Sequence, residues 1–330
     1  MHLKANAKRP GLALVCFWLF LILFQMPVNI SHAAERRIAV IYPIVKKPYS
    51  TVFEQIIDGI AAEAKTNIIK YGLKGVDEKQ RTAIQQWISD QQPDVIVVLG
   101  RRGIQAVQNL KLTIPSVFGG VLYIADNTLD NATGISLTPD PKQLFGQLKR
   151  LSPETKRVFV VYNPARYQWL IDLAESAAAE FGITLVTKAA EGLRDSARIH
   201  RDILREAQRR KDSVWLLQDS RIIGSNAILP MILRESWNKK LTVFSSNPSD
   251  VPRGILFSFY ADNKMLGKNL AKLALSKLAL SKLDATQKSS TLILPLPDAL
   301  SAVNLRTASH LGLHISFEEQ RKFGLVFPRK

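Results

Sequence analysis

The sequence predicts an α/β protein of two similar lobes, each a parallel sheet with helices on both faces. The chain has 330 residues, which is more than one typical domain and enough for two. Short β-rich apolar runs alternate with longer helical patterns. The same alternation restarts near the middle of the chain, so we expect two lobes rather than one long sheet.

A targeting segment opens the chain. Three basic residues precede the apolar run 11–24, and Ser31-His32-Ala33 places small residues where a signal peptidase cleaves. We therefore expect residues 1–33 to be a signal peptide, because a membrane span needs about 20 apolar residues. An uncleaved anchor is the alternative, and both place the rest of the chain outside the cytoplasm. Cys16, the single cysteine, lies in this segment, so the mature chain is expected to have no disulfide.

The first repeat of the pattern begins after the signal segment. We expect strands at 37–42, 94–99 and 114–118, and helices at 52–71, 77–90 and 104–110. The run 94–99 is almost wholly apolar, which is typical of a parallel strand buried on both faces. This order indicates a parallel sheet covered by helices.

The second repeat follows a junction expected near residues 133–136. Its strands are predicted at 157–162, 184–187, 214–217 and 241–244, and its helices at 167–181, 196–210 and 225–238. Beyond it we expect a strand at 255–259, a long helix at 263–283, an apolar strand within 287–297 and a short helix at 304–311.

Charge and motifs exclude several function classes. The net charge is +17, but the basic residues are scattered, so we expect no nucleic-acid partner. His310 and His314 stand four apart, yet Gly312 between them is expected to end the helix, so no metal site is predicted. Neither a nucleophile elbow nor a phosphate-binding glycine motif occurs. We therefore expect no enzyme activity and no cofactor.

Candidate ligand contacts follow from the rule that open parallel sheets bind ligands at the carboxyl ends of their strands. If the lobes close on each other, the two sets of strand ends face one solute. The rule selects Tyr42, Ser50, Thr51, Gly100, Arg101, Gly119 and Gly120 in the first lobe, and Tyr162, Asn163, Asp219, Ser246 and Asn247 in the second. Tyr260 is added as an aromatic candidate for stacking on a flat ligand.

Two of these candidates carry the most specific chemistry. The turn 100–103 joins glycines and Arg101 to a helix N-terminus, which suits a carboxylate or phosphate; a solvated arginine pair is the alternative. Asp219 follows an apolar strand and suits a ligand ammonium; the alternative is a turn residue that caps backbone N–H groups. The tyrosines either stack on a flat ligand or belong to the lobe cores.

The chain resembles the solute-binding proteins of bacterial ABC transporters, specifically the branch linked to tryptophan and tyrosine uptake. The resemblance rests on the order and spacing of residues 93–98, 114–118, 132–136, 157–164, 253–255, 303–308 and 311–313. It implies a periplasmic-binding-protein type I fold with three hinge crossovers and a permease with a cytoplasmic ATPase as partner. It also implies that residues 34–134 and about 252–284 form the first lobe, and that residues 135–251 and about 285–330 form the second.

These observations together predict a monomeric periplasmic protein that captures a small organic solute, amino-acid-like or another small anion. A ligand-sensing partner of a membrane sensor kinase or chemoreceptor is the alternative on the same fold. An exported hydrolase is disfavoured, because the mature chain has three poorly placed histidines.

Overall fold

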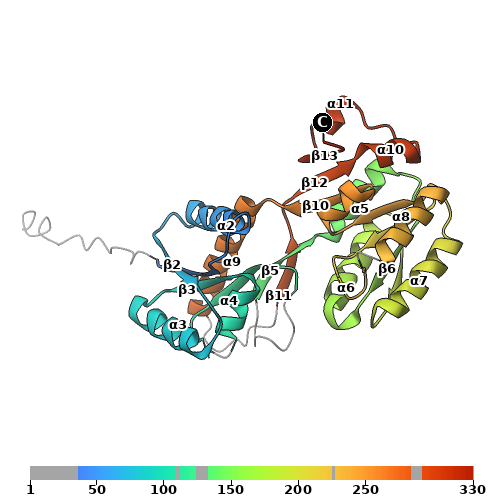
Figure 1. Cartoon of the computed structure of the whole chain (residues 1–330). Helices are drawn as coiled ribbons and strands as arrows, with labels where there is room; N and C mark the ends of the chain where they lie inside the picture. The colour runs from blue at the N-terminus through green and yellow to red at the C-terminus, as the bar shows by residue number, and fades with distance from the viewer. Residues whose placement is uncertain are drawn as a thin grey trace, which may run out of the picture. The chain divides into compact units, whose positions relative to one another are not determined.

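The computed structural model describes residues 36–108, 110, 112–123, 133–224, 227–283 and 292–329, which form two sheets covered by helices (Figure 1). The expected signal segment 1–33 lies outside the described residues. In the described part of the chain, no helix combines the length and apolarity needed to cross a bilayer.

The first sheet has six described strands in the order β11-β5-β4-β3-β1-β2, and all neighbours run parallel. The strands are β1 (Ile38–Pro43), β2 (Ile68–Leu73), β3 (Val95–Leu99), β4 (Ser116–Val121), β5 (Thr133–Pro139) and β11 (Leu292–Leu296). Its helices are α2 (Tyr49–Ala64), α3 (Glu78–Gln91), α4 (Gly100–Val107) and α9 (Asn263–Leu283).

Alternating side chains divide the first lobe into two cores. Ile38 and Val40 of β1 belong to the core beneath α2 and α9, whereas Ala39 and Ile41 belong to the core beneath α3 and α4. All four side chains are fully buried. A strand buried on both faces needs an unbroken apolar run, which is the pattern that the sequence shows.

The second sheet has seven described strands in the order β13-β12-β10-β9-β8-β6-β7, and β12 and β10 are the only antiparallel pair among the neighbouring strands that the structure describes. The strands are β6 (Arg157–Tyr162), β7 (Thr184–Ala189), β8 (Asp212–Leu216), β9 (Thr242–Ser245), β10 (Phe257–Ala261), β12 (Ala299–Asn304) and β13 (Leu325–Phe327). The helices are α5 (Pro141–Leu151), α6 (Pro164–Glu180), α7 (Leu193–Glu206), α8 (Ile228–Lys239), the 3-10 turn η1 (Pro248–Arg253), α10 (Leu305–Leu311) and α11 (Phe317–Gln320).

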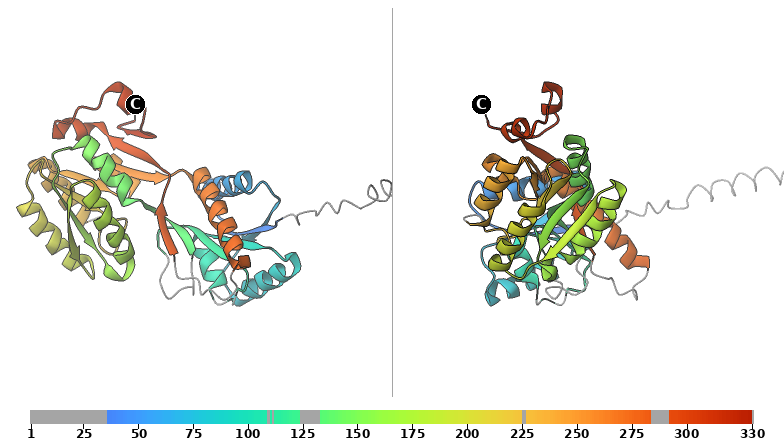
Figure 2. Two further views of the ribbon diagram at one scale, coloured as in Figure 1. Left: turned by 180° about the vertical axis from the view of Figure 1, so that it is seen from behind. Right: turned by 90° about the vertical axis from the view of Figure 1, so that its right-hand side faces the viewer.

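The second lobe repeats the two-core arrangement, with helices on both faces of its sheet (Figure 2). Val158 and Val160 of β6 pack with α5 and α6, and Phe159 and Val161 pack with α7 and α8. The α/β class and the two lobes of parallel sheet predicted from the sequence are confirmed.

Within the residues that the structure describes, the chain passes between the two sheets three times, from β5 to α5, from β10 to α9 and from β11 to β12. Sheet membership differs from the expected division at two strands. β10 pairs in the second sheet, although residues 252–284 were expected in the first lobe. β11 pairs with β5 in the first sheet, although residues 285–330 were expected in the second lobe.

The helix predicted at 52–71 is wrong beyond Ala64. The structure ends α2 there, because Lys65 adopts a left-handed conformation with φ of 51°. Residues 68–73 form the edge strand β2 instead. The apolar spacing of Ile60, Ala64, Ile68 and Tyr71 continues the helical period, but the β-branched pair Ile68-Ile69 and Tyr71 favour a strand.

Two glycines bring α2 and α9 into backbone contact. A methyl group on Gly59 would overlap the Lys264 carbonyl oxygen, and one on Gly267 would overlap the Ile56 carbonyl oxygen. The two helices therefore lie side by side although they are far apart in the sequence (Figure 1). Only glycine permits this close approach of two helix backbones.

We predict that Gly59→Ala lowers the free energy of unfolding by about 1–3 kcal/mol, because an added methyl group forces α2 away from α9. Urea denaturation of the purified protein measures this. Gly75→Ala is the matched control, since the nearest atom to its added methyl group lies 3.7 Å away. Equal stability of both variants would contradict the close helix contact.

His200 is a fully buried imidazole on α7. Its Nδ1 lies 2.8 Å from the Ser196 carbonyl oxygen and 3.1 Å from the Ser196 hydroxyl. Its Nε2 is buried and has no hydrogen-bond partner among the described residues. Burial lowers the pKa of His200 from 6.5 to about 4, although the hydrogen bond to the Ser196 backbone opposes the shift. The ring is therefore neutral and carries its proton on Nδ1 at neutral pH.

We predict that acid destabilises the protein through His200. Below pH 6.5 the His200 imidazole is protonated in the unfolded chain, but it stays neutral in the folded protein because its pKa there is about 4. The free energy of unfolding should therefore fall by roughly 1.4 kcal/mol per pH unit between pH 6.5 and 4 from this group. Denaturation of wild type and His200→Gln at pH 7, 6 and 5 should show a shallower slope in the variant. Exposed His314→Gln is the control, and a slope unchanged in His200→Gln would refute the assignment.

Candidate functional site

Two glycines shape the carboxyl edge of the first sheet. Gly100 follows β3 with φ of 73°, and Gly120 lies at the end of β4 with φ of 71°. A methyl group on Gly120 would lie 3.5 Å from the Gly100 nitrogen, so the two turns are adjacent. Phe53 of α2 packs against both positions. The left-handed conformations favour glycine at both positions. Because glycine has no side chain, a molecule at this edge of the sheet can approach the backbone closely.

The N-terminus of α4 starts in this turn. No side chain caps the helix, so its first backbone N–H groups have no side-chain acceptor among the described residues. Arg101 and Arg102 stand exposed in the first turn. Free N–H donors, the positive end of the helix dipole and a guanidinium are a combination that suits a carboxylate or phosphate group.

Tyr123 follows β4 and is held beside the first crossover. The carbonyl oxygen of Leu122 accepts hydrogen bonds from the Ser136 hydroxyl at 2.7 Å and the Thr138 hydroxyl at 3.2 Å. Both hydroxyls belong to β5, which leads into the second lobe. The position of Tyr123 is therefore tied to the strand that connects the sheets.

Arg166 of α6 meets Tyr123 from the second lobe. Its guanidinium carbon lies 5.0 Å from the centre of the Tyr123 ring, which is a cation–π contact. The same guanidinium reaches Asp219 at the end of β8, with 3.5 Å between Nη1 and Oδ1. Tyr123, Arg166 and Asp219 thus form one chain of contacts that joins the carboxyl edges of the two sheets.

Asp219 combines burial with an incomplete set of partners. Its side chain is 1% exposed, and its Oδ1 accepts a hydrogen bond from the Arg221 backbone at 2.9 Å. Its Oδ2 is buried without a hydrogen-bond partner among the described residues. A buried carboxylate oxygen without a donor costs about 1–3 kcal/mol or more, so a ligand that supplies a donor gains that energy.

Tyr167 closes the second-lobe side of this group. Its hydroxyl donates to the Gln218 carbonyl oxygen at 2.9 Å. Burial, followed by the negative charge of Asp219, raises the pKa of Tyr167, so the phenol stays protonated. The hydrogen bond fixes the strand end that carries Asp219.

The structure brings several predicted site residues to the sheet edges. Gly100 and Arg101 lie at the first edge, and Tyr162, Asn163 and Asp219 lie at the second. The Tyr162 hydroxyl donates to Gln168 Oε1 at 3.0 Å, and the ring belongs to the core. The remaining first-lobe residues sit on nearby elements: half-buried Tyr42 at the end of β1, and Ser50 and Thr51 in the first turn of α2.

Four other predicted residues contact neighbouring parts of the protein, and the proposed pocket does not include them. A methyl group on Gly119 would meet the Leu270 side chain of α9 at 2.5 Å, so this glycine faces the helix. The Ser246 hydroxyl accepts from Trp215 Nε1 at 2.9 Å. Asn247 caps η1, and Tyr260 packs against the backbone of Gly324.

The strand-end prediction missed Phe53, Tyr123 and Arg166 as site residues. The strand expected to end at Phe118 continues to Val121, so Tyr123 moves to the strand end. Arg166 stands in the first turn of the helix after β6 rather than on the strand. Extending the carboxyl-edge rule to the first turn of each following helix would have selected Arg166, whereas Phe53 lies one residue beyond the first turn of α2.

Within the described ranges, no three histidine, cysteine or acidic side chains gather in a group that could hold a metal ion. His310 stacks on Trp237 with 3.6 Å between ring centres, and its Nε2 lies 2.8 Å from the Trp237 carbonyl oxygen. His310 of α10 therefore packs on Trp237 of α8.

Comparisons with known proteins agree with this architecture. A family model described as ABC transporter substrate binding protein matches residues 37–315. No curated protein matches the chain.

Solved structures share the fold. A ligand-free, open substrate binding protein with adhesive properties from Clostridium difficile is 16% identical, covering 88% of this chain and 99% of its own, with a TM-score of 0.57. A conserved domain protein from Vibrio cholerae is 21% identical, covering 88% and 99%, with a TM-score of 0.50. A Streptococcus pneumoniae domain in complex with L-Trp is 18% identical, covering 89% and 100%, with a TM-score of 0.49. The first two show the two-lobed periplasmic-binding-protein fold alone.

We predict that Arg166→Met lowers the free energy of unfolding by about 1–3 kcal/mol, because the buried Asp219 carboxylate loses its cation. Adding Asp219→Asn should recover much of the loss, since it removes the uncompensated charge. Chemical denaturation of the single and double variants measures both effects. Arg198→Met removes an exposed ion pair to Asp195 and should change stability by less than about 1 kcal/mol. A double variant less stable than Arg166→Met would contradict the pairing.

Proposed function

The chain belongs to the ABC transporter substrate-binding protein family, and we propose that it captures a small organic solute between its lobes and delivers it to a membrane permease with a cytoplasmic ATPase. Members of this family bind solutes and are not enzymes. The proposal places the solute at the carboxyl edges of the two sheets, where parallel sheets bind their ligands.

The observation that carries the proposal is the buried Oδ2 of Asp219, which has no donor among the described residues. Arg166 holds the other carboxylate oxygen, so the side chain is fixed in place. An oxygen that is both desolvated and unpaired favours a ligand ammonium or another hydrogen-bond donor over water. In this proposal Asp219 is the acceptor pole of the pocket.

The first lobe supplies the opposite pole. The uncapped N-terminus of α4 and the Arg101 guanidinium suit a carboxylate or another small anionic group. A solute with an ammonium at one end and a carboxylate at the other matches both poles, so an amino-acid-like ligand is the class that we favour. Tyr123 adds an aromatic face beside Arg166.

The three crossovers supply the movement that such capture requires. A solute that contacts both lobes binds their closed arrangement more tightly than the open one, and so shifts the population toward closure. The permease would then distinguish the loaded from the empty protein by the arrangement of the lobes. The protein acts in the periplasm in this proposal, after the signal segment 1–33 directs export.

We predict that at least one L-amino acid or small carboxylate raises the melting temperature of the purified protein. Asp219→Asn should weaken the binding of that solute about tenfold or more, because the ligand loses a charge-assisted hydrogen bond. Arg101→Ala should weaken it in the same direction. Thermal-shift screening identifies the solute, and isothermal titration calorimetry measures the affinities.

Asp195→Asn, which alters an exposed carboxylate on α7, is the matched control and should keep the wild-type affinity. Circular dichroism checks that each variant is folded. A solute bound with unchanged affinity by Asp219→Asn and Arg101→Ala would place the pocket elsewhere. Turnover of esters or amides by the purified protein would overturn the binding-protein assignment itself.

A further inference from the structure

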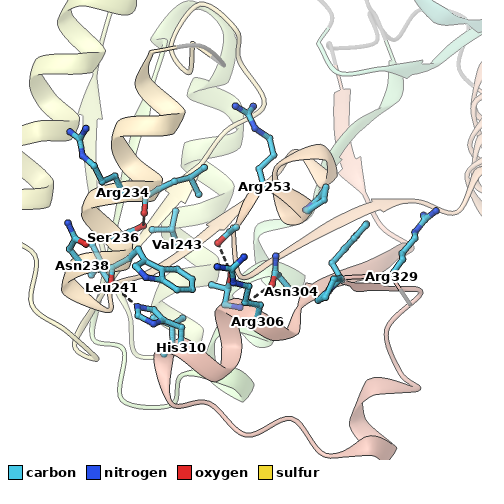
Figure 3. Close-up of a pocket in the computed structure, with 18 residues that line it drawn as sticks. Arg234, Ser236, Asn238, Leu241, Val243, Arg253, Asn304, Arg306, His310 and Arg329 are labelled. Atoms are coloured by element: carbon cyan, nitrogen blue, oxygen red, sulfur yellow. Dashed lines mark hydrogen bonds between the residues drawn. The ribbon is translucent and has the colours of Figure 1, made fainter.

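A second cavity lies in the second lobe, at the edge of the sheet opposite the proposed solute pocket. It has a volume of about 690 Å³ and lies among α8, η1, α10 and the chain end beyond β13 (Figure 3). Val243 at the start of β9, Gly254 before β10 and Asn304 at the end of antiparallel β12 line it. These positions mark the amino-terminal edge of β9 and β10, so we call the cavity the distal pocket.

The floor of the distal pocket presents carbon to its interior. Four of its polar side chains already bond main-chain carbonyl groups: Ser236 with Leu233, Asn304 with Val251, Thr307 with Gly254, and His310 with Trp237. The apolar part of the lining includes Leu241, Val243, Leu311 and Phe327. The buried part of a ligand is therefore expected to be apolar, because few polar groups of the floor are free to form hydrogen bonds with it.

The rim has the opposite character. Arg234, Arg253, Arg306 and Arg329 line the pocket, and no acidic residue does so in the described part of the chain. In Figure 3, Arg306 lies at the lower centre, with Arg253 above it, Arg234 to the upper left and Arg329 to the right. Four guanidinium groups without a lining carboxylate create a positive potential at the mouth.

Nearby carboxylates neutralise only part of the positive charge of these four arginines. Arg234 contacts Glu235 at 3.2 Å, and Asp250 lies near Arg253. Within the described residues, no carboxylate lies within 4.0 Å of Arg306 or Arg329.

Both of these arginines lie over aromatic rings instead. The guanidinium carbon of Arg306 is 5.5 Å from the Trp237 ring centre, and that of Arg329 is 5.5 Å from the Phe327 ring centre. Stacking of this kind orients a guanidinium while its N–H edge stays able to donate to an anion.

We propose that the distal pocket binds a free amphiphilic anion, with a carboxylate or phosphate head at the arginine rim and an apolar body on the floor. The volume falls in the range of small-molecule sites, and the apolar floor with a few cationic groups at one end matches such a ligand in shape and charge. The site is separate from the proposed solute pocket, which lies at the carboxyl edges of the sheets, and it stands or falls independently of that function.

Isothermal titration calorimetry of the purified protein with octanoate, octanol and octylammonium tests the proposal. We expect octanoate to bind and the neutral and cationic analogues to bind at least tenfold more weakly. Arg306→Gln should weaken octanoate binding about tenfold, because one charge-assisted contact is lost. Arg329→Gln changes an exposed position near the chain end and should act in the same direction without disturbing the fold.

Arg321→Gln is the matched control. Arg321 lies over Phe317 at 5.1 Å, the same kind of contact, outside the distal pocket. It and Asp219→Asn should keep the wild-type affinity for octanoate. Equal binding of octanol and octanoate would overturn the proposal, as would unchanged affinity in both Arg306→Gln and Arg329→Gln. Loss of octanoate binding in Asp219→Asn, or binding to anionic phospholipid vesicles with none to free octanoate, would also overturn it.

Discussion

The backbone contact between α2 and α9 at Gly59 and Gly267 is the constraint on which the two-lobed arrangement depends. It lets a helix that leaves the second sheet pack directly on the first lobe. With α9 in place, Leu266, Leu270 and Ala274 complete the core that Ile38 and Val40 begin. The strand after α9 can then pair with β5, and the chain must cross back to reach β12. The crossovers beside the candidate site follow from this packing.

Two buried acids at the carboxyl edge of the second sheet differ in how many hydrogen-bond partners their carboxylate oxygens have. Burial raises the pKa of Asp250, but the Ser245 hydroxyl at 2.8 Å and the Asn247 amide at 3.2 Å satisfy both carboxylate oxygens. Asp219 is buried to a similar degree, yet one of its oxygens has no donor in the described chain. Both carboxylate oxygens of Asp250 are used within the turn, whereas Asp219 Oδ2 can still accept a hydrogen bond.

Prediction from the sequence succeeded where the pattern of apolar residues favours one type of element. The unbroken apolar run at Val95–Leu99, rich in β-branched residues, predicted a strand buried on both faces, and the restart at Arg157 predicted a second lobe. It failed at Ile68–Leu73, where an edge strand kept the helical spacing of the preceding helix. The strand-end rule selected Gly100 and Asp219, and it also selected Gly119, which faces the Leu270 side chain, and Ser246, whose hydroxyl accepts a hydrogen bond from Trp215. The Tyr123–Arg166 contact joins residues of two lobes, and no local pattern encodes it.

The threading of the first lobe also sets an order of events during synthesis. α9 and β11 reach the first sheet only after the whole stretch from α5 to β10 has been made. A nascent chain that ends before Asn263 therefore leaves Ile56 and Ile60 of α2 without the helix that covers them. The first lobe is therefore among the last parts of the protein to complete its core, because the apolar face of α2 stays uncovered until α9 is available to pack on it.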